Sequence, residues 1–388
     1  MKPVLDGLSL VDISTGIAGA YAAMLLAEMG MDCIKVEPPG GDPAREMPGF
    51  AIWNRSKRGL TLDINTADGK EILGRLLEKA DVLIESFSPA QAQRLKVDYD
   101  SIYLLNERII YCAISPFGEK GPLAEKPADE GVVAAYAGIM AGQGGLGHPP
   151  VYVTLPLASY GAAMQTAYGA AAALYVREIS GIGQKVEVSL LAGAIGQQSA
   201  SFLRSEAIQP IALPYGMQQG VVAVYRLYEC QDQWFMLACG NQNFWNKLCI
   251  AIDRVDLIAD PRFENAPWGI ADMDDQLALT NILADTFKQK PRAYWLDLLA
   301  DADVPCAPVN SREEFMEDPQ VLHNNMIVDI DDPHYGKTRQ MGIPITLTEN
   351  PGTIKGPAPS PGEHNHEVLA GLGYSDKAIE DFAGRKII

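Results

Sequence analysis

Segments typical of strands and segments typical of helices alternate over the first part of the chain. Short runs rich in β-branched residues lie at residues 8–14, 32–37, 59–64, 81–85 and 108–115. Helix-like stretches separate them, namely residues 21–29, 66–80 and those after Pro89. Because neighbouring parallel strands are joined by crossovers that are usually helices, this alternation predicts an α/β protein with a mostly parallel, helix-covered sheet.

Residues 131–176 contain no Asp, Glu, Lys or Arg. The pattern here predicts a strand at 151–155 and then a helix from about 158 to 177, dense in Ala and Gly. A membrane span would need about 20 strongly apolar residues, and this stretch includes Pro149, Pro150, Pro156 and Gln165. We therefore expect a buried central helix that approaches its neighbours closely and ends near Gly181.

The charge balance limits the partners of the chain. Lys and Arg number 31 and Asp and Glu 49, which gives a formal charge of −18 over 388 residues. Such a surface is a poor ligand for nucleic acid or anionic lipid, and an anionic small molecule would need a local basic pocket. The six cysteines lie mostly in apolar runs and no secretory signal precedes them, so we expect reduced thiols and a cytoplasmic protein.

A second unit follows a change of composition. Pro, Gly and Gln between residues 210 and 220 predict a linker, followed by strands near 222–228 and 234–238. Helical patterns occupy residues 243–252, 274–289 and 291–302, and strand-like alternation returns at 326–347 before a helix at 363–372. We expect a large domain over residues 1–205, a linker over 206–225, a small α/β domain over 226–325 and a C-terminal segment over 326–388.

Two segments could carry ligand chemistry. The glycine-containing loop at residues 14–19 joins the first strand to the first helix, where it could hold a phosphate or simply form a tight turn. Residues 54–58 form the densest basic cluster, which could anchor a phosphorylated ligand or form a solvated loop. His364 and His366 are not accompanied by a third ligand in sequence, so we expect no metal site.

A series of short segments along nearly the whole chain forms one ordered pattern. These segments are residues 5–7, 11–12, 18–19, 24–27, 34–43, 54–55, 57–58, 60–63, 81–85, 181–188, 304–310, 318–321, 362–364 and 372–374. Taken together, they resemble the class III CoA transferase family, also called the CaiB/BaiF or formyl-CoA/carnitine CoA transferase family.

The resemblance implies a large Rossmann-like domain, a smaller α/β domain, a C-terminal segment that returns to the large one, and a dimer of two interlocked rings. It also implies coenzyme A or an acyl-CoA as substrate, a carboxylic acid as co-substrate, and no metal. The residues that it places at coenzyme A are Ile17, Ala18, Leu62, Asn65, Ser86, Phe87, Arg94 and Lys126.

One position departs from the family pattern. Relatives carry a nucleophilic aspartate where this chain has Ser159, at the start of the central helix. A carboxylate suits the reaction because its attack on a thioester gives a mixed anhydride that remains reactive, whereas a serine would give a stable ester and would need an adjacent base. Asp129 or Glu130 could substitute only if the fold brought them near. We therefore expect no catalytic residue in this chain.

Three functions remain open from the sequence. The chain could be the subunit without a nucleophile in a heteromeric CoA transferase, paired with a homologous chain that keeps the aspartate. In that case it would move CoA from an acyl-CoA such as succinyl-CoA to a dicarboxylic acid such as benzylsuccinate. It could instead be a standalone CoA-thioester enzyme that uses another residue, or a CoA-binding or regulatory protein without catalysis.

Overall fold

The computed structural model describes residues 2–143, 148–203, 205–206 and 219–388. The chain divides into two compact units. The first combines Met1–Ile139, Val153–Leu203 and Pro319–Ile388, and the second combines Met140–Tyr152 and Arg204–Asp318. Residues 207–218, which make up most of the expected linker, lie outside the described residues.

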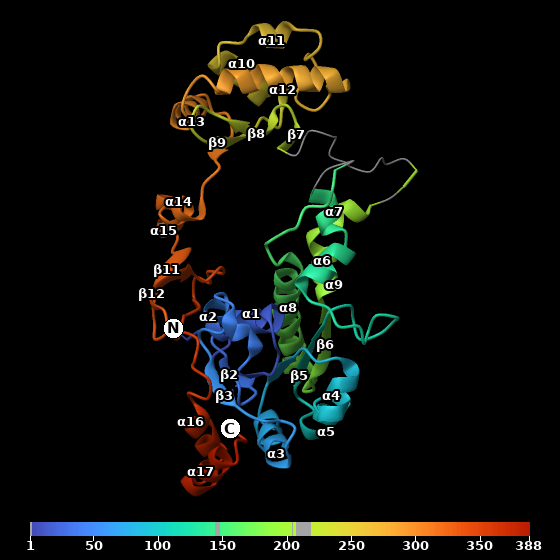
Figure 1. Cartoon of the computed structure of the whole chain (residues 1–388), viewed down its shortest axis with the longest axis vertical. Coiled ribbons are helices and arrows are strands. Elements are labelled where there is room, and N and C mark those ends of the chain that lie inside the picture. The colour runs from blue at the N-terminus through green and yellow to red at the C-terminus, as the bar shows by residue number, and fades with distance from the viewer. Residues whose placement is uncertain (1, 144–147, 204, 207–218) are drawn as a thin grey trace. The chain divides into compact units, whose positions relative to one another are not determined.

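A six-stranded parallel sheet forms the centre of the first unit (Figure 1). Its order is β3-β2-β1-β4-β5-β6, and all five strand pairs are parallel. The predicted α/β fold with a parallel sheet is confirmed. The strands are β1 (Ser9–Asp12), β2 (Asp32–Glu37), β3 (Arg58–Thr61), β4 (Val82–Glu85), β5 (Ile110–Ser115) and β6 (Gln184–Ser189).

Helices surround this sheet in the order that the alternating pattern predicts. Those of the N-terminal part are α1 (Ile17–Glu28), α2 (Phe50–Trp53), α3 (Ala67–Leu77), α4 (Pro89–Leu95) and α5 (Tyr99–Leu105), with a short 3₁₀ turn at Pro43–Glu46. Those that follow are α6 (Glu130–Tyr136), α8 (Leu157–Ser180) and α9 (Leu190–Gln197), with a second 3₁₀ turn at Ser199–Phe202. The short α7 (Ile139–Gln143) belongs to the second unit except for its first residue.

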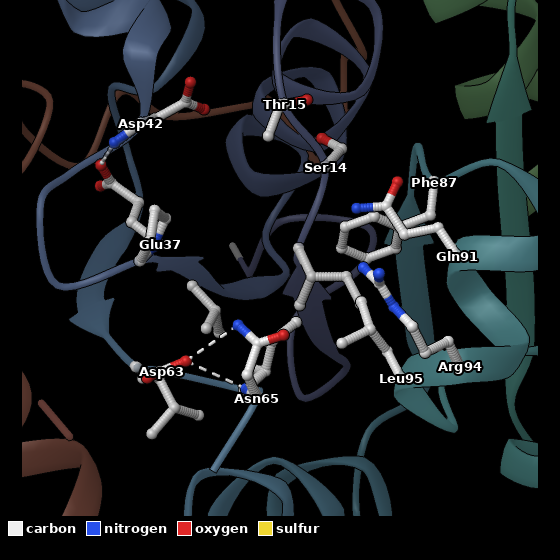
Figure 2. Close-up of a pocket in the computed structure, with 15 residues that line it drawn as sticks. Ser14, Thr15, Glu37, Asp42, Asp63, Asn65, Phe87, Gln91, Arg94 and Leu95 are labelled. Atoms are coloured by element: carbon white, nitrogen blue, oxygen red, sulfur yellow. Dashed lines mark hydrogen bonds between the residues drawn. The ribbon is translucent and has the colours of Figure 1, made fainter.

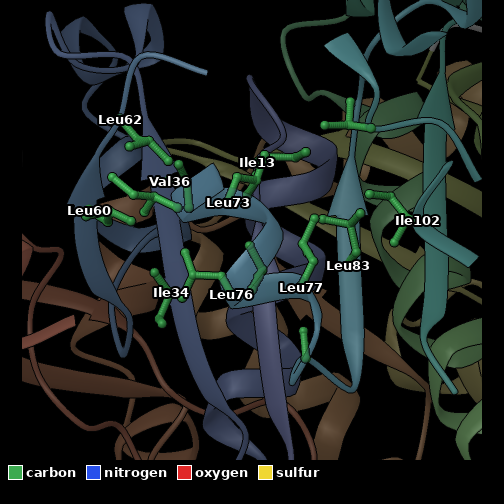
Figure 3. Packing of buried hydrophobic residues seen from close by; sticks show 14 of the residues in the cluster. Ile13, Ile34, Val36, Leu60, Leu62, Leu73, Leu76, Leu77, Leu83 and Ile102 are labelled. Atoms are coloured by element: carbon green, nitrogen blue, oxygen red, sulfur yellow. The ribbon is translucent and has the colours of Figure 1, made fainter. Parts of the chain in front are cut away.

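Successive residues of each strand point to opposite faces of the sheet, so the first unit has two hydrophobic clusters. On one face Ile34, Val36 and Leu83 pack against Leu73 and other apolar residues of α3 (Figure 3). On the other face the neighbouring strand residues pack against α1 and α8. Burial of both faces explains why these strands read as nearly continuous apolar runs rather than as alternating ones.

Small residues let α8 lie very close to α9, as predicted. A Cβ atom built on Gly161 would lie 2.7 Å from the carbonyl oxygen of Gly193, and one on Gly193 would lie 2.3 Å from that of Ala158. α8 ends at Gly181, whose φ of 79° is the left-handed conformation that glycine adopts most easily. The expected helix and its close packing are confirmed, but its complete burial is wrong for the single chain, because Tyr168, Tyr175 and Ile179 are exposed.

The strand predicted at residues 151–155 is wrong, because these residues have no strand structure. The place beside β5 is taken by β6, whose residues Gln184–Ser189 pair with Ile110–Ser115. Pro149, Pro150 and Pro156 flank the segment, and a proline has no backbone N–H to donate to a sheet.

The second unit has a four-stranded antiparallel sheet with the order β10-β9-β8-β7. Its core gathers aromatic residues, with Phe235, Trp245, Phe263 and Phe287 all fully buried. The strands are β7 (Gly220–Val222), β8 (Tyr225–Glu229), β9 (Trp234–Ala238) and β10 (Cys306–Pro308). The helices are α10 (Gln242–Ala251), α11 (Asp256–Ala259), α12 (Met273–Phe287), α13 (Arg292–Asp301) and α14 (Arg312–Met316).

The C-terminal part of the chain returns to the first unit. It contains α15 (Pro319–His323), the hairpin strands β11 (Ile327–Asp332) and β12 (Gly336–Met341), α16 (Asn365–Gly371) and α17 (Asp376–Gly384). Asn365 accepts from the backbone of Thr61, and Ile387 accepts from that of Asp63, so this segment is tied to the end of β3. Among the described residues, no helix is long and apolar enough to cross a membrane.

Candidate active site

A cavity of about 280 Å³ opens at the carboxyl end of the parallel sheet. Its residues follow β1, β2, β3 and β4, and include the point between β1 and β4 where the strand order reverses. Ligands of open α/β sheets bind at such a point. The lining residues are Ile13, Ser14, Thr15, Val36, Glu37, Pro38, Asp42, Leu62, Asp63, Ile64, Asn65, Phe87, Gln91, Arg94 and Leu95.

The loop after β1 forms the floor of this pocket and is fixed by local hydrogen bonds. The hydroxyl of Ser14 donates to Oδ1 of Asp12 at 2.6 Å, and the N–H of Thr15 donates to Oγ of Ser86 at 2.9 Å. Gly16 has a φ of 78° and precedes α1. A Cβ atom on Gly19 would lie 2.1 Å from Oγ of Ser14, so the loop is packed directly on the first turn of α1.

Buried charged side chains stabilise this loop. Nζ of Lys57 donates to Oδ2 of Asp12 at 2.9 Å, and Nζ of Lys35 donates to the carbonyl oxygen of Ser14 and pairs with Asp42 at 3.2 Å. Burial alone would raise the pKa of Asp12, but the charges of Lys35 and Lys57 and the Ser14 hydrogen bond outweigh it and lower this pKa to about 2. The loop is therefore held by an ionised, fully buried network.

The two sides of the pocket carry different polar groups, and the carboxylates among them are paired, Glu37 with Arg45 at 2.6 Å and Asp42 with Lys35. Glu37 and Asp42 lie on one side and Gln91 and Arg94 of α4 on the other (Figure 2). Asn65 is oriented by Asp63, whose Oδ1 accepts from both its backbone and its side-chain nitrogen at 3.0 Å. The exposed guanidinium of Arg94 gives this acidic protein a local positive group at the pocket.

Four of the eight residues expected at coenzyme A line this one pocket, namely Leu62, Asn65, Phe87 and Arg94. Ser86 lies next to it and accepts from the pocket residue Thr15. The other three expected residues are not among those that line it. Ile17 is half-buried and packs on a core cluster, Ala18 is buried in α1, and Lys126 is exposed.

Sequence reasoning missed several pocket residues. Gln91 lies three residues before Arg94, on the same side of α4, so helical spacing from Arg94 could have identified it. Glu37 and Asp42 belong to residues 34–43, a segment that carries the family resemblance, but nothing in the sequence shows that their side chains line a pocket. Thr15 belongs to the glycine-containing loop, and its place in the pocket favours the ligand interpretation of that loop.

The basic cluster at residues 54–58 is neither a phosphate anchor nor a solvated loop. Arg55 is fully buried, and its guanidinium pairs with Glu28 and donates to the carbonyl oxygen of Met341 at 2.6 Å. Lys57 is buried against Asp12. The basic residues of the cluster are the charged partners that the buried carboxylates of Glu28 and Asp12 need. Through Arg55, the cluster also joins α1 to β12.

Ser159 lies in the first turn of α8 beside a carboxylate from α6. Oε2 of Glu130 accepts from the backbone N–H of Ser159 at 2.7 Å, and Oε1 accepts from that of Ala158 at 3.0 Å. Pro156, which precedes the helix, has no side-chain acceptor for these orphan donors, so Glu130 replaces the usual cap. The fold thus brings a carboxylate to the helix end where the family aspartate is expected.

Among the described residues, no three His, Cys, Asp or Glu side chains come together in a way that could hold a metal ion. The structure offers a ligand pocket at the carboxyl end of the parallel sheet, and carboxylate and hydroxyl groups near the start of α8.

The fold and the pocket define an α/β protein with a Rossmann-like parallel sheet, and comparison with known proteins identifies its family. The sequence profile of CoA-transferase family III matches residues 5–365, so the chain belongs to this family of CoA transferases. The solved structure of a CaiB/BaiF family protein from Brucella suis is similar with a TM-score of 0.84 and 28% identity, over 96% of this chain and 100% of that one.

Curated relatives agree with this assignment. An acetyl-CoA:oxalate CoA-transferase from Acetobacter aceti is 31% identical over 91% of this chain and 93% of its own length. A succinyl-CoA–D-citramalate CoA-transferase from Chloroflexus aurantiacus is 28% identical over 97% and 96%, respectively. The predicted family is confirmed.

Proposed function

We propose that this chain is the subunit without a nucleophile in a heteromeric class III CoA transferase. Its partner is a homologous chain that carries the catalytic aspartate. The complex moves CoA from succinyl-CoA to a dicarboxylic acid. The observation that carries this proposal is the hydroxyl of Ser159 at the start of α8, where the family resemblance places the nucleophile.

The chemistry of CoA transfer explains why Ser159 matters. In the partner, the aspartate attacks the acyl thioester, CoA leaves as a thiolate, and a mixed anhydride of the aspartate and the donor acid forms. The thiolate then attacks the aspartyl carbonyl of this anhydride, which releases the donor acid and leaves CoA bound to the aspartate as a thioester. The acceptor carboxylate displaces CoA to form a second anhydride, and the thiolate attacks the acceptor carbonyl of that anhydride to release the new acyl-CoA and the free aspartate. A serine ester cannot hold this activation, and both oxygens of the neighbouring Glu130 are occupied by backbone amides.

The surface of α8 supports assembly with another chain. Large apolar side chains recur along one exposed face of this helix at the spacing of successive turns. Tyr168 is 78% exposed and Ile179 is 75% exposed in the single chain. The members of this face are Met164, Tyr168, Tyr175, Val176 and Ile179. Exposed apolar patches of this kind mark protein contacts.

The pocket supports binding of coenzyme A to this chain. Its walls combine the apolar side chains of Leu62 and Phe87 with the guanidinium of Arg94. Apolar groups suit the adenine ring, and a guanidinium suits phosphate. Contacts of Lys126, Ile17 and Ala18 with coenzyme A stay predictions. The cytoplasmic location of the protein also stays a prediction.

The names of the relatives support a dicarboxylic acid as acceptor. Oxalate and D-citramalate are both dicarboxylic acids, and the second relative takes CoA from succinyl-CoA. Benzylsuccinate, the acid expected as an example from the sequence, belongs to the same class and stays a prediction.

One observation favours a second candidate function. The carboxylate of Glu130 lies at the helix end where the family resemblance places the nucleophile, so in a standalone CoA transferase it would release the amides of Ala158 and Ser159 and take the role of the missing aspartate. The covalent adduct would then form on Glu130 of this chain.

The two candidates differ in what the isolated chain does. The chain is purified from its native host, and any co-purifying homologue of similar mass is identified. Transfer from succinyl-CoA to a panel of dicarboxylates is then assayed with the isolated chain and with the mixture. We expect activity only in the mixture. Robust transfer by the isolated chain, with an acyl or CoA adduct on Glu130 found by mass spectrometry, would overturn the heteromer and support the second candidate.

A further inference from the structure

Glu85 is the last residue of β4, and its side chain is 2% exposed. Its Oε2 accepts a hydrogen bond from the backbone N–H of Phe87, 2.7 Å away. Phe87 lines the pocket, and the helix that follows carries Gln91 and Arg94 into it. The carboxyl of Glu85 therefore fixes the turn that sets one wall of the pocket.

The same carboxyl faces titratable groups from the neighbouring segments. These are Tyr111 and Cys112 of β5, Glu119 from the loop after β5, and Lys185 of β6. Tyr111, Glu119 and Lys185 also line a second cavity of about 200 Å³, where Lys185 pairs with Glu119. Glu85 thus contacts both the wall of the first pocket and a polar cluster that the proposed reaction does not use.

The surroundings make both protonation states of Glu85 accessible near neutral pH. Burial raises the pKa of this carboxyl to about 7, and the charge of Glu119 acts in the same direction. The Phe87 amide and Lys185 favour the carboxylate, whereas the Tyr111 hydroxyl donates to the carbonyl oxygen of Val97 at 2.8 Å. A change of one proton at this position therefore changes the strength of the bond to the Phe87 amide.

We propose that Glu85 is a positioning residue for the coenzyme A site, whose ionised carboxylate holds Phe87 and the start of α4 in the arrangement that binds the ligand. This inference rests on the proposed function. A carboxylate accepts an N–H hydrogen bond about twice as strong as that of a neutral acceptor. Protonation of Glu85 weakens the bond, so proton uptake and ligand binding oppose each other.

The test compares the wild type with Glu85→Gln, whose amide oxygen can still accept from the Phe87 N–H but does not titrate. Coenzyme A affinity is measured by calorimetry at about pH 8 and about pH 6. Between about pH 8 and about pH 6, we expect the affinity of the wild type to fall about fivefold more than that of the variant, which is at the lower end of couplings between sites. The phosphate of coenzyme A also titrates over this range, but it affects both proteins equally and so cancels in the comparison. An equal pH dependence would overturn the positioning role.

A second measurement separates this inference from the proposed function. In the ligand-free protein labelled with ¹⁵N-phenylalanine, the Phe87 amide signal is assigned with Phe87→Leu and followed against pH. We expect it to titrate in the wild type and to stay constant in Glu85→Gln. A titrating amide without any coenzyme A binding would contradict the proposed function. Coenzyme A binding with a Phe87 amide that does not respond to pH would contradict the role of Glu85 alone.

Discussion

The carboxylate of Glu130 accepts a hydrogen bond of 2.7 Å from the backbone nitrogen of Ser159, so a residue from α6 completes the first turn of α8. Its second oxygen binds the nitrogen of Ala158. The helix that would carry the family nucleophile therefore begins with a negative charge, which the positive end of a helix favours. Any chemistry at position 159 takes place beside this charge.

Ser159→Asp is expected to restore covalent chemistry. The new carboxylate would occupy the family position and form an acyl anhydride or CoA thioester adduct with succinyl-CoA, because a carboxylate retains the activation of the thioester. Mass spectrometry after hydroxylamine trapping detects the adduct. Ser159→Asn has nearly the same size and should form none.

The neighbouring charge should affect this variant. Two carboxylates close together raise the pKa of one of them, so adduct formation by Ser159→Asp should require a higher pH than in Ser159→Asp with Glu130→Gln. If neither protein forms an adduct although both bind coenzyme A, the site in this chain has lost more than its nucleophile.

Glu130→Ala is expected to destabilise the protein by about 0.5–2 kcal/mol, because two N–H groups of α8 lose their acceptor. Thr66→Ala is the matched control, since Oγ1 of Thr66 caps α3 through Gly69 at 3.0 Å and lies outside α8. Both variants should show similar losses in urea denaturation. In the heteromer, neither variant should lower the transfer rate beyond the loss of folded protein, because the proposed nucleophile lies in the partner. A selective loss of rate in Glu130→Ala would favour the second candidate, in which Glu130 is the nucleophile.

The sequence predicts most elements of the first unit because their signals are local. The helix predicted from residue 66 begins there, with Thr66 as the cap of α3, β2 spans the predicted residues 32–37, and the Ala- and Gly-rich run forms α8. The prediction failed at residues 151–155, since β propensity there says nothing of which strand pairs with β5. That choice depends on distant residues, here those of β6.

The site was predictable only in part, for a related reason. Leu62, Asn65, Phe87 and Arg94 come together because parallel strands end at one edge of the sheet. In contrast, the burial of Arg55 depends on Glu28 and Met341, far away in the sequence, so a basic cluster alone could not show it. The bond from Glu130 to Ser159 likewise joins two helices whose packing no local pattern encodes.

Gly19→Ala is expected to weaken coenzyme A binding. The added Cβ would lie 2.1 Å from Oγ and 2.4 Å from Cβ of Ser14, which forces the loop with Thr15 to move. Gly74→Ala is the matched control in α3, where a Cβ meets nothing within 4 Å. This control should gain about 0.5–1 kcal/mol of stability and keep its affinity. Calorimetry measures the affinity, and unchanged binding in Gly19→Ala would exclude the loop from the site.

Lys57→Met is expected to cost about 3–5 kcal/mol, because it removes one partner of a fully buried ion pair with Asp12. Lys70→Met, at an exposed position of α3, should change stability by less than about 0.5 kcal/mol. The stability contribution of Asp12 is present above its usual pKa of 3.8 and is lost as the pH falls through about 2. Without Lys57 this contribution should shrink, which urea denaturation at acidic pH would detect.

Glu85→Gln is expected to stabilise the protein at about pH 8, although we propose that the ionised residue serves binding. The pKa of Glu85 is raised from 4.5 to about 7, so the folded state holds the proton more tightly than the unfolded one. Stability of the wild type therefore falls as the pH rises from 4.5 through about 7, by up to about 3 kcal/mol at about 1.4 kcal/mol per pKa unit. The neutral amide avoids this loss. The free energies of unfolding of the variant and the wild type should therefore differ more and more over this pH range, which urea denaturation measures. Glu78→Gln, at an exposed position, is the control for the general effect of replacing a Glu by a Gln. A difference that is constant with pH would show that Glu85 stays ionised or neutral throughout, and would remove the basis for a pH-dependent site.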